Sequence, residues 1–347
     1  MLLPPLKLTA LQQARIWGGQ KLCRQLGKFG LDSENIGESW EVSDQDGASS
    51  IIQGGGFDGR SLRDVFVTHQ QELMGAQAGR YMRFPLLNKF IDARDKLSVQ
   101  VHPGENSPLG DAKNEAWYVV DAPEDAAIIV GIKSLETPEQ ILRKLKTAEA
   151  PGVLNHIPVV PGDVLYIPAG TVHAITEGLL IYEVQQNSDT TFRLYDWGRV
   201  DATGVPRPLH LEQAAAVIDY SDRTHYKIRP LEIQSEKARI RYRAANSYFA
   251  LIEYCSSHGH TVELNGHFLI LTCLQGKLEI SGGFDTVLLN LGETLLVPAI
   301  CKTLCLREME KNSRVITSFI PVDDNEIAEP LRAAGYTENA IADLAGG

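Results

Sequence analysis

The feature that most constrains the fold of this chain is the spaced set Gly162-x5-Pro168-x-Gly170-x2-His173. The residues between Gly162 and Pro168 include the apolar run VLYI, which is typical of a buried strand. Pro168 and Gly170 favour a sharp corner, because proline has a fixed φ and glycine adopts backbone conformations that other residues avoid. We therefore expect His173 to re-enter on the next strand with its side chain pointing into a β-barrel.

Much of the remaining chain also has the pattern of strands. Short β-branched or aromatic runs, such as those at 116–120 and 268–274, are separated by Gly, Pro, Asp and Asn. Helices are few: Ser61 and Thr137 are each followed three residues later by a residue that completes a capping box, and 209–219 is a third candidate. The sequence predicts an all-β fold with a few short helical insertions.

Two units of this kind fit in the chain. Its 347 residues exceed the usual size of one domain, and 44% of them are hydrophobic, enough for two cores. Residues 161–169 and 291–299 resemble each other as turn, strand and Pro-Ala corner, but no histidine follows the second corner. We predict a catalytic domain with N-terminal strands and helical insertions at 1–235, a second, metal-free barrel at 236–322, and a helical tail at 323–347.

Charge and composition exclude several partners. The formal net charge of -11 disfavours binding to nucleic acid or to an anionic membrane, because both require a basic surface. No apolar run approaches the roughly 20 residues of a membrane helix, and the first residues lack the pattern of a signal peptide. The five cysteines are scattered, as is typical of reduced thiols. We expect a cytoplasmic protein.

A candidate metal site precedes and includes the corner. Gln100 and His102 are two residues apart and therefore lie on one face of a strand, and Glu115 opens the next strand-like run. With His173 they resemble the two motifs of the cupin superfamily, with glutamine in place of the first histidine. A lone inward histidine is more often a core residue than a ligand, but three buried polar groups together would each need a partner. This mixed nitrogen and oxygen set suits Zn²⁺ and tolerates Mn²⁺, Fe²⁺ or Co²⁺.

Further blocks of sequence make the resemblance more specific. They are similar, in order, to blocks of type I mannose-6-phosphate isomerases, in the shorter bacterial form, over roughly residues 10 to 320. The blocks lie at 17–19, 37–41, 97–103, 113–118, 167–174 and 183–193. The resemblance implies two cupin-like (jelly-roll) barrels and an aldose-ketose isomerase that interconverts mannose 6-phosphate and fructose 6-phosphate through a cis-enediol or enediolate.

The resemblance also implies roles for particular residues. The positions that match the family's zinc ligands, with one Zn²⁺ per chain, are Gln100, His102, Glu115 and His173. Arg193 and Lys113 match its active-site arginine and lysine, and Arg199 falls where the family has a cation suited to the substrate phosphate, a role that Lys113 can share. Glu183 is a candidate base, but it could equally pair with an arginine as a structural residue.

Two other functions stay open at this point. One is a cupin metalloenzyme of another class, such as an Fe²⁺ dioxygenase, and the other is a non-catalytic regulatory protein that binds sugar phosphates. The glutamine at position 100 and the nearby cations disfavour the first, and the complete ligand set disfavours the second. For the isomerase, the expected partner is a small sugar phosphate, with no nucleic acid and no membrane, and the chain is expected to be a monomer or a weak homo-oligomer.

Overall fold

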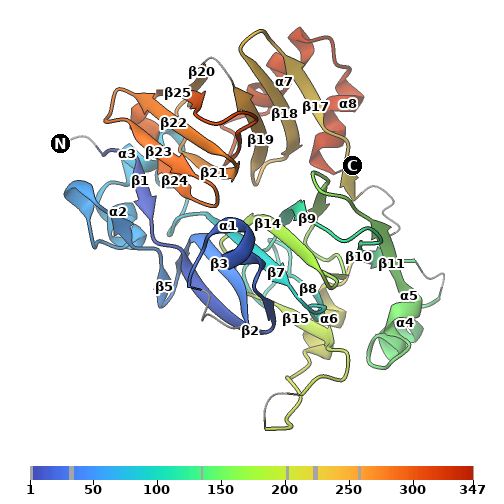
Figure 1. Cartoon of the computed structure of the whole chain (residues 1–347). Coiled ribbons are helices and arrows are strands. Elements are labelled where there is room, and N and C mark those ends of the chain that lie inside the picture. Colours follow the sequence, from blue (N-terminus) through green and yellow to red (C-terminus); the bar gives the residue numbers. More distant parts are fainter. Residues whose placement is uncertain are drawn as a thin grey trace.

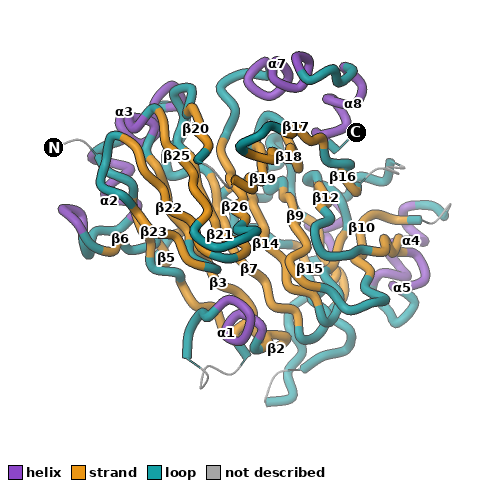
Figure 2. The backbone as a smooth tube through the Cα atoms, turned by 45° about the horizontal axis from the view of Figure 1, so that its top comes forward, coloured by secondary structure: helices purple, strands orange, loops and turns teal. Residues whose placement is uncertain are grey.

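The computed structural model describes residues 3–30, 35–133, 136–200, 203–221, 226–256 and 259–346. Several antiparallel sheets make up most of it, and the helices are few and short, as Figures 1 and 2 show. The predicted all-β, cupin-like fold is therefore confirmed. None of the helices in these ranges is long and apolar enough to span a membrane.

The first unit is a sandwich of two antiparallel sheets. The seven-stranded sheet has the order β16 (Lys227–Ile228), β12 (Val164–Ile167), β9 (Glu115–Asp121), β14 (Leu179–Gln186), β7 (Leu86–Ala93), β2 (Leu11–Gly19), β3 (Ile36–Val42). The five-stranded sheet has the order β11 (Leu154–Pro158), β10 (Ala127–Ile132), β13 (His173–Ala174), β8 (Val99–Val101), β15 (Phe192–Tyr195). Alternate residues of each strand point inward, so Trp117 and Ile181 of one sheet pack against Ile128 and Val130 of the other.

The second unit is also a sandwich of two antiparallel sheets. Its eight-stranded sheet has the order β17 (Leu231–Gln234), β18 (Ala238–Ala245), β19 (Ala250–Ser256), β26 (Arg314–Phe319), β21 (Leu269–Gln275), β24 (Thr294–Val297), β1 (Leu6–Leu8), β6 (Ile52–Gln53). Its four-stranded sheet has the order β20 (His260–Glu263), β25 (Thr303–Glu308), β22 (Lys277–Gly282), β23 (Val287–Asn290). Because β1 and β6 pair at the edge of the eight-stranded sheet, the N-terminal segment contributes to both units.

A buried set of polar side chains joins the two units. The Asn88 side-chain amide on β7 donates to the Tyr182 hydroxyl at 2.9 Å and to the Ser318 hydroxyl on β26 at 2.7 Å. The Tyr182 hydroxyl also lies 2.9 Å from that of Thr272 on β21, which lies 2.9 Å from that of Thr294 on β24. All five side chains are buried, so these hydrogen bonds fix how the two large sheets sit against each other.

The helices lie around the edges of the sheets. Those predicted from capping boxes are α2 (Leu62–Thr68), capped by Ser61, and α4 (Pro138–Leu145), capped by Thr137, and both boxes are formed. The third predicted helix is α6 (Leu211–Val217). The remaining short elements are α1 (Lys21–Leu26), β4 (Asp44–Gln45), β5 (Ala48–Ser49), η1 (Gly55–Phe57), α3 (Gln70–Met74), η2 (Gly75–Gln77), α5 (Ala150–Val153), η3 (Ala299–Cys301), α7 (Asn325–Ala333), α8 (Glu338–Ala342) and η4 (Asp343–Ala345). The sequence after β26 is thus largely helical.

Candidate metal centre and active site

The candidate site is a polar cavity of about 430 Å³ in the first unit. Five residues singled out from the sequence line it: Gln100, Lys113, Glu115, Glu183 and Arg193. Five ionisable residues to which the sequence analysis assigned no role also line it: Arg15, Glu38, Lys89, Asp189 and Arg207. Arg199 is not among the lining residues. The cavity combines a compact group of metal-ligating side chains with an excess of cationic groups, which suits an anionic ligand.

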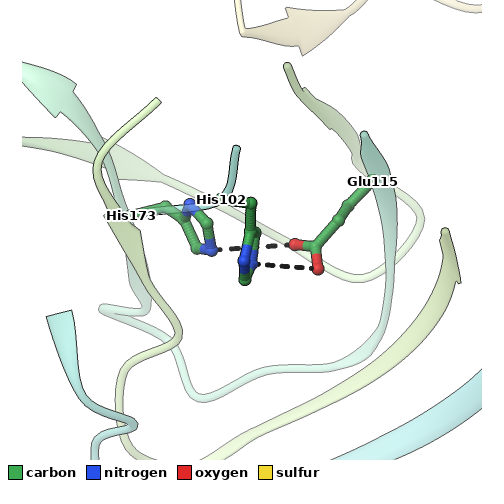
Figure 3. A group of neighbouring side chains, drawn as sticks. All are labelled: His102, Glu115 and His173. Carbon is green, nitrogen blue, oxygen red and sulfur yellow. Dashed lines mark ion pairs between the residues drawn. The ribbon is translucent and has the colours of Figure 1, made fainter. Parts of the chain in front are cut away.

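The centre of this site is formed by side chains from three strands. His102 follows β8, Glu115 opens β9, and His173 opens β13 directly opposite Gln100 of β8. Figure 3 shows both imidazole rings directed at the Glu115 carboxylate, with Nε2 of His102 3.3 Å and Nε2 of His173 3.7 Å from its oxygens. One ligand atom from each residue lies within 4.8 Å of the others. The three residues could therefore share one metal ion.

Backbone carbonyls hold both histidines in the form that binds metals. Nδ1 of His102 lies 2.8 Å from the Thr190 carbonyl, and Nδ1 of His173 lies 2.8 Å from the Thr171 carbonyl. Each Nδ1 must carry the proton and donate, which leaves the Nε2 lone pair facing Glu115. Burial lowers the pKa of His102 and, with His102 nearby, lowers that of His173 to about 3. Both rings are therefore neutral at physiological pH.

The Glu115 carboxylate provides the negative charge of the centre. Burial alone would raise the pKa of Glu115, but the ammonium of Lys113 holds it well below its usual range. Nζ of Lys113 lies 2.6 Å from Glu115 and 3.3 Å from Nε2 of His102, so a cation already lies between these two ligands. Neither carboxylate oxygen accepts a well-directed hydrogen bond from the part of the chain described here. A buried carboxylate of this kind fits a divalent metal ion.

Gln100 completes the group of predicted ligands. Its amide nitrogen lies 3.3 Å from Nε2 of His173. The two ends of a glutamine amide are interchangeable by a half-turn, which would direct its oxygen at the same point. Gln100, His102, Glu115 and His173 thus converge, as their spacing predicts.

A buried ion pair forms the wall beside this centre. Lys89 on β7 and Glu183 on β14 stand directly opposite in the sheet and pair at 2.8 Å, while the Trp117 indole donates to Glu183 at 2.7 Å. Burial and the Glu115 carboxylate raise the pKa of Glu183, and Lys89 opposes this. Burial alone would lower the pKa of Lys89, but Glu183 and Glu38 together raise it. Glu183 therefore faces the cavity, and its partner is a lysine.

Glu38 extends this wall on the neighbouring strand β3. Its carboxylate accepts a hydrogen bond from the Trp40 indole at 2.7 Å and is held by the Arg15 guanidinium, with two nitrogens at 3.2 Å. Burial opposes ionisation of Glu38, but Lys89 and Arg15 lower its pKa below the usual value. The wall is thus an alternating series of charges. In the sequence, Lys89 and Glu38 are charged residues within otherwise apolar strands. That their side chains point inward becomes clear only once the pairing of the strands is known.

Two arginines reach the cavity from the opposite side. Arg193 on β15 donates to the Pro208 carbonyl at 2.9 Å, and its Nε is buried without a hydrogen-bond partner in the described structure. Arg207 pairs with Asp196 through two hydrogen bonds, at 2.8 and 2.5 Å. Arg199 pairs with the same carboxylate at 2.6 Å from outside the cavity. Arg207 lies in a loop with no strand pattern, so the sequence did not indicate its position.

Comparison with known proteins agrees with this geometry. Residues 6–137 match the family described as phosphomannose isomerase type I, catalytic domain. Mannose-6-phosphate isomerase from Streptococcus mutans is 33% identical over 303 residues, 86% of this chain and 94% of the relative. The mannose-6-phosphate isomerase ManA of Bacillus subtilis is 34% identical over 304 residues, 85% of this chain and 93% of the relative.

A solved structure shows the same fold over nearly the whole chain. The crystal structure of mannose 6-phosphate isomerase from Bacillus subtilis superimposes with a TM-score of 0.83 at 29% identity, covering 91% of this chain and 99% of that one. The similarity thus extends over most of both units. The chain belongs to the type I mannose-6-phosphate isomerase family.

Proposed function

We propose that this protein is a metal-dependent isomerase that interconverts mannose 6-phosphate and fructose 6-phosphate through a cis-enediol or enediolate. The observation that carries this proposal is the convergence of His102, Glu115 and His173, of which Glu115 lines the same cavity as Lys113 and Arg193. The relatives named above carry the same activity in their names, and the chain covers nearly all of their length.

The metal in this proposal is one Zn²⁺ held by Gln100, His102, Glu115 and His173. Two neutral imidazoles, a carboxylate and an amide oxygen are a ligand set that zinc accepts. When bound, such an ion acts as a Lewis acid toward the sugar oxygens.

The side chains around the centre supply the remaining chemistry. The reaction moves a proton between C2 and C1, and negative charge develops on the sugar oxygens. Lys113 and Arg193 are placed to stabilise that charge, and Glu183, with its raised pKa, is our candidate for the group that carries the proton. Arg207 lines the cavity and is a better candidate for the phosphate ligand than Arg199, whose guanidinium lies outside it.

The two alternative functions receive less support from this geometry. A dioxygenase would need a mostly apolar pocket, whereas nine ionisable residues line this one. A non-catalytic binding protein would not require the paired histidine–carbonyl hydrogen bonds that leave both Nε2 atoms free for a metal. A cytoplasmic location and a monomeric or weakly associated state remain predictions from the sequence, and light scattering after gel filtration tests the second.

A coupled assay tests the proposal directly. Purified protein is assayed for fructose 6-phosphate formed from mannose 6-phosphate, then after chelator treatment, and again after Zn²⁺ is returned. We expect activity that is lost and restored. Folded, zinc-loaded protein without activity would overturn the proposed reaction, and full activity without bound metal would overturn the proposed metal dependence.

A further inference from the structure

A second polar cavity lies on the second unit, in the eight-stranded sheet. Its volume is about 520 Å³. Its floor residues come from four adjacent strands or their ends: Arg239, Arg241, Cys255, Gln275 and Arg314. The site described above uses none of these residues.

Strand register places these side chains in one row. Arg239 on β18 is opposite Cys255 on β19, and Gln275 on β21 is opposite Arg314 on β26. Since Tyr254 is paired with Val315, Cys255 and Arg314 are also neighbours across β19 and β26. Residues opposite each other in a sheet point to the same face, so the guanidinium groups of Arg239 and Arg314 flank a single small side chain.

The charges of this row are not balanced within the structure. Arg241 is neutralised by Glu232 at 2.7 Å and by Glu253 at 3.1 Å, and Glu253 also holds Arg243. By contrast, Arg239 contacts only the Cys255 thiol, at 4.0 Å, and Arg314 only the Tyr118 hydroxyl, at 3.5 Å, among the hydrogen bonds and ion pairs of the residues described. The Nε atoms of both are buried without a hydrogen-bond partner.

Half-buried guanidinium groups that no carboxylate pairs with directly gain stability when an anion binds between them, and Glu253 acts on Arg314 only at longer range. Desolvating a charge without a partner is costly, and an arginine fork binds tetrahedral oxyanions through paired hydrogen bonds. Glu236, Lys237 and Glu308 also line the cavity. Because two of these are carboxylates, the favoured position for an anion is between Arg239 and Arg314.

We propose that this cavity is a second anion site, which binds a phosphate group between Arg239 and Arg314. A phosphate dianion matches two guanidinium groups, whereas a single carboxylate matches one. The volume admits inorganic phosphate or a small phosphomonoester. The site uses no residue of the candidate active site, so it can be tested separately from the proposed isomerase activity.

The first test locates the anion in the unaltered protein. Crystals of the full, zinc-loaded chain are soaked in tungstate, a tetrahedral dianion whose anomalous signal identifies its position. We expect a peak between the guanidinium groups of Arg239 and Arg314, in addition to any peak in the active-site cavity. Absence of density at this point would overturn the proposal without any variant being needed.

The second test measures binding in solution. The double variant R239Q/R314Q is compared with R307Q/R332Q, which removes two exposed, carboxylate-paired arginines elsewhere and so matches the change of charge. Titration calorimetry with inorganic phosphate should show one site per chain weakened at least tenfold in R239Q/R314Q and unchanged in the control. Equal loss in both variants, or in neither, would show that only the overall charge matters and would refute the site.

Two further measurements complete the design. Thermal melting and turnover of mannose 6-phosphate establish that R239Q/R314Q is folded, since neither residue lines the active-site cavity. A parallel titration with glycerol 3-phosphate identifies the source of the phosphate group: tighter binding than inorganic phosphate indicates a phosphomonoester, and equal binding indicates the free ion. Failure of both probes to bind would reject the proposal.

Discussion

The ion pair between Lys89 and Glu183 allows a sharp prediction about the wall of the active-site cavity. The two residues are 8% and 2% exposed, and their side chains pair at 2.8 Å. Lys89→Met keeps the length of the side chain and removes its charge. Glu183 then retains only the Trp117 indole as a donor, at 2.7 Å, so a buried carboxylate loses its counter-ion.

The expected loss of stability in Lys89→Met follows from the burial of both side chains of the ion pair. Removing one partner of a buried ion pair costs about 3–5 kcal/mol, because the other charge stays desolvated. For a chain of this size we convert at about 2 °C per kcal/mol, which gives a fall in Tm of about 6–10 °C. The pKa of Glu183 is already raised by burial and by Glu115, and loss of Lys89 raises it further.

The pH dependence gives the prediction a second check. In Lys89→Met the folded state holds a proton on Glu183 at pH values where the unfolded chain has lost it. Stability of the variant therefore falls as pH rises above the unfolded pKa, about 4.3. We expect a larger loss of Tm relative to the original protein at pH 8 than at pH 5.5.

Thermal melting of zinc-saturated protein at both pH values measures this, with K89M/E183Q as the matched control. The double variant has no buried carboxylate at this position, so it should recover most of the lost stability and show little dependence on pH. A single variant that melts within about 2 °C of the original protein would refute the reasoning. A K89M/E183Q double variant that is no more stable than K89M would refute it as well.

Three other predictions follow from the site and the interface. His173→Ala should lose both bound zinc, measured by elemental analysis, and activity, whereas Arg193→Ala should keep the zinc and lose turnover. Arg207→Gln should raise KM for mannose 6-phosphate at least tenfold, measured by steady-state kinetics, with Arg199→Gln closer to the original value. Asn88→Ala should lower the free energy of unfolding by about 1–3 kcal/mol in urea titrations, because it removes two buried hydrogen bonds.

Much of the candidate site could be read from the sequence because its residues lie on short, regular segments. Gln100 lies on β8 and His102 directly follows that strand, two residues later, and the corner at Pro168 and Gly170 fixes where His173 re-enters the barrel. The capped helices were predictable for the same reason, since their signals lie within four residues. In these cases residues close together in the sequence were sufficient to predict the local structure.

Other parts depend on pairings between distant segments. Lys89 reaches Glu183 through the register of β7 and β14, more than ninety residues apart in sequence. Arg207 reaches the cavity from a loop, where neither period nor burial can be read from residue types. The pairing of β1 with β24 could not be predicted either, because β1 has three residues and β24 lies near the other end of the chain.

The polar side chains buried between the two large sheets have a consequence for how such a protein can change in evolution. Separated from the second unit, the first would expose Phe90 and Tyr182 and leave Asn88 without Ser318. We therefore expect the two units to be inherited together rather than exchanged one at a time by recombination. A change at Asn88 or Ser318 would need a matching change in the other unit.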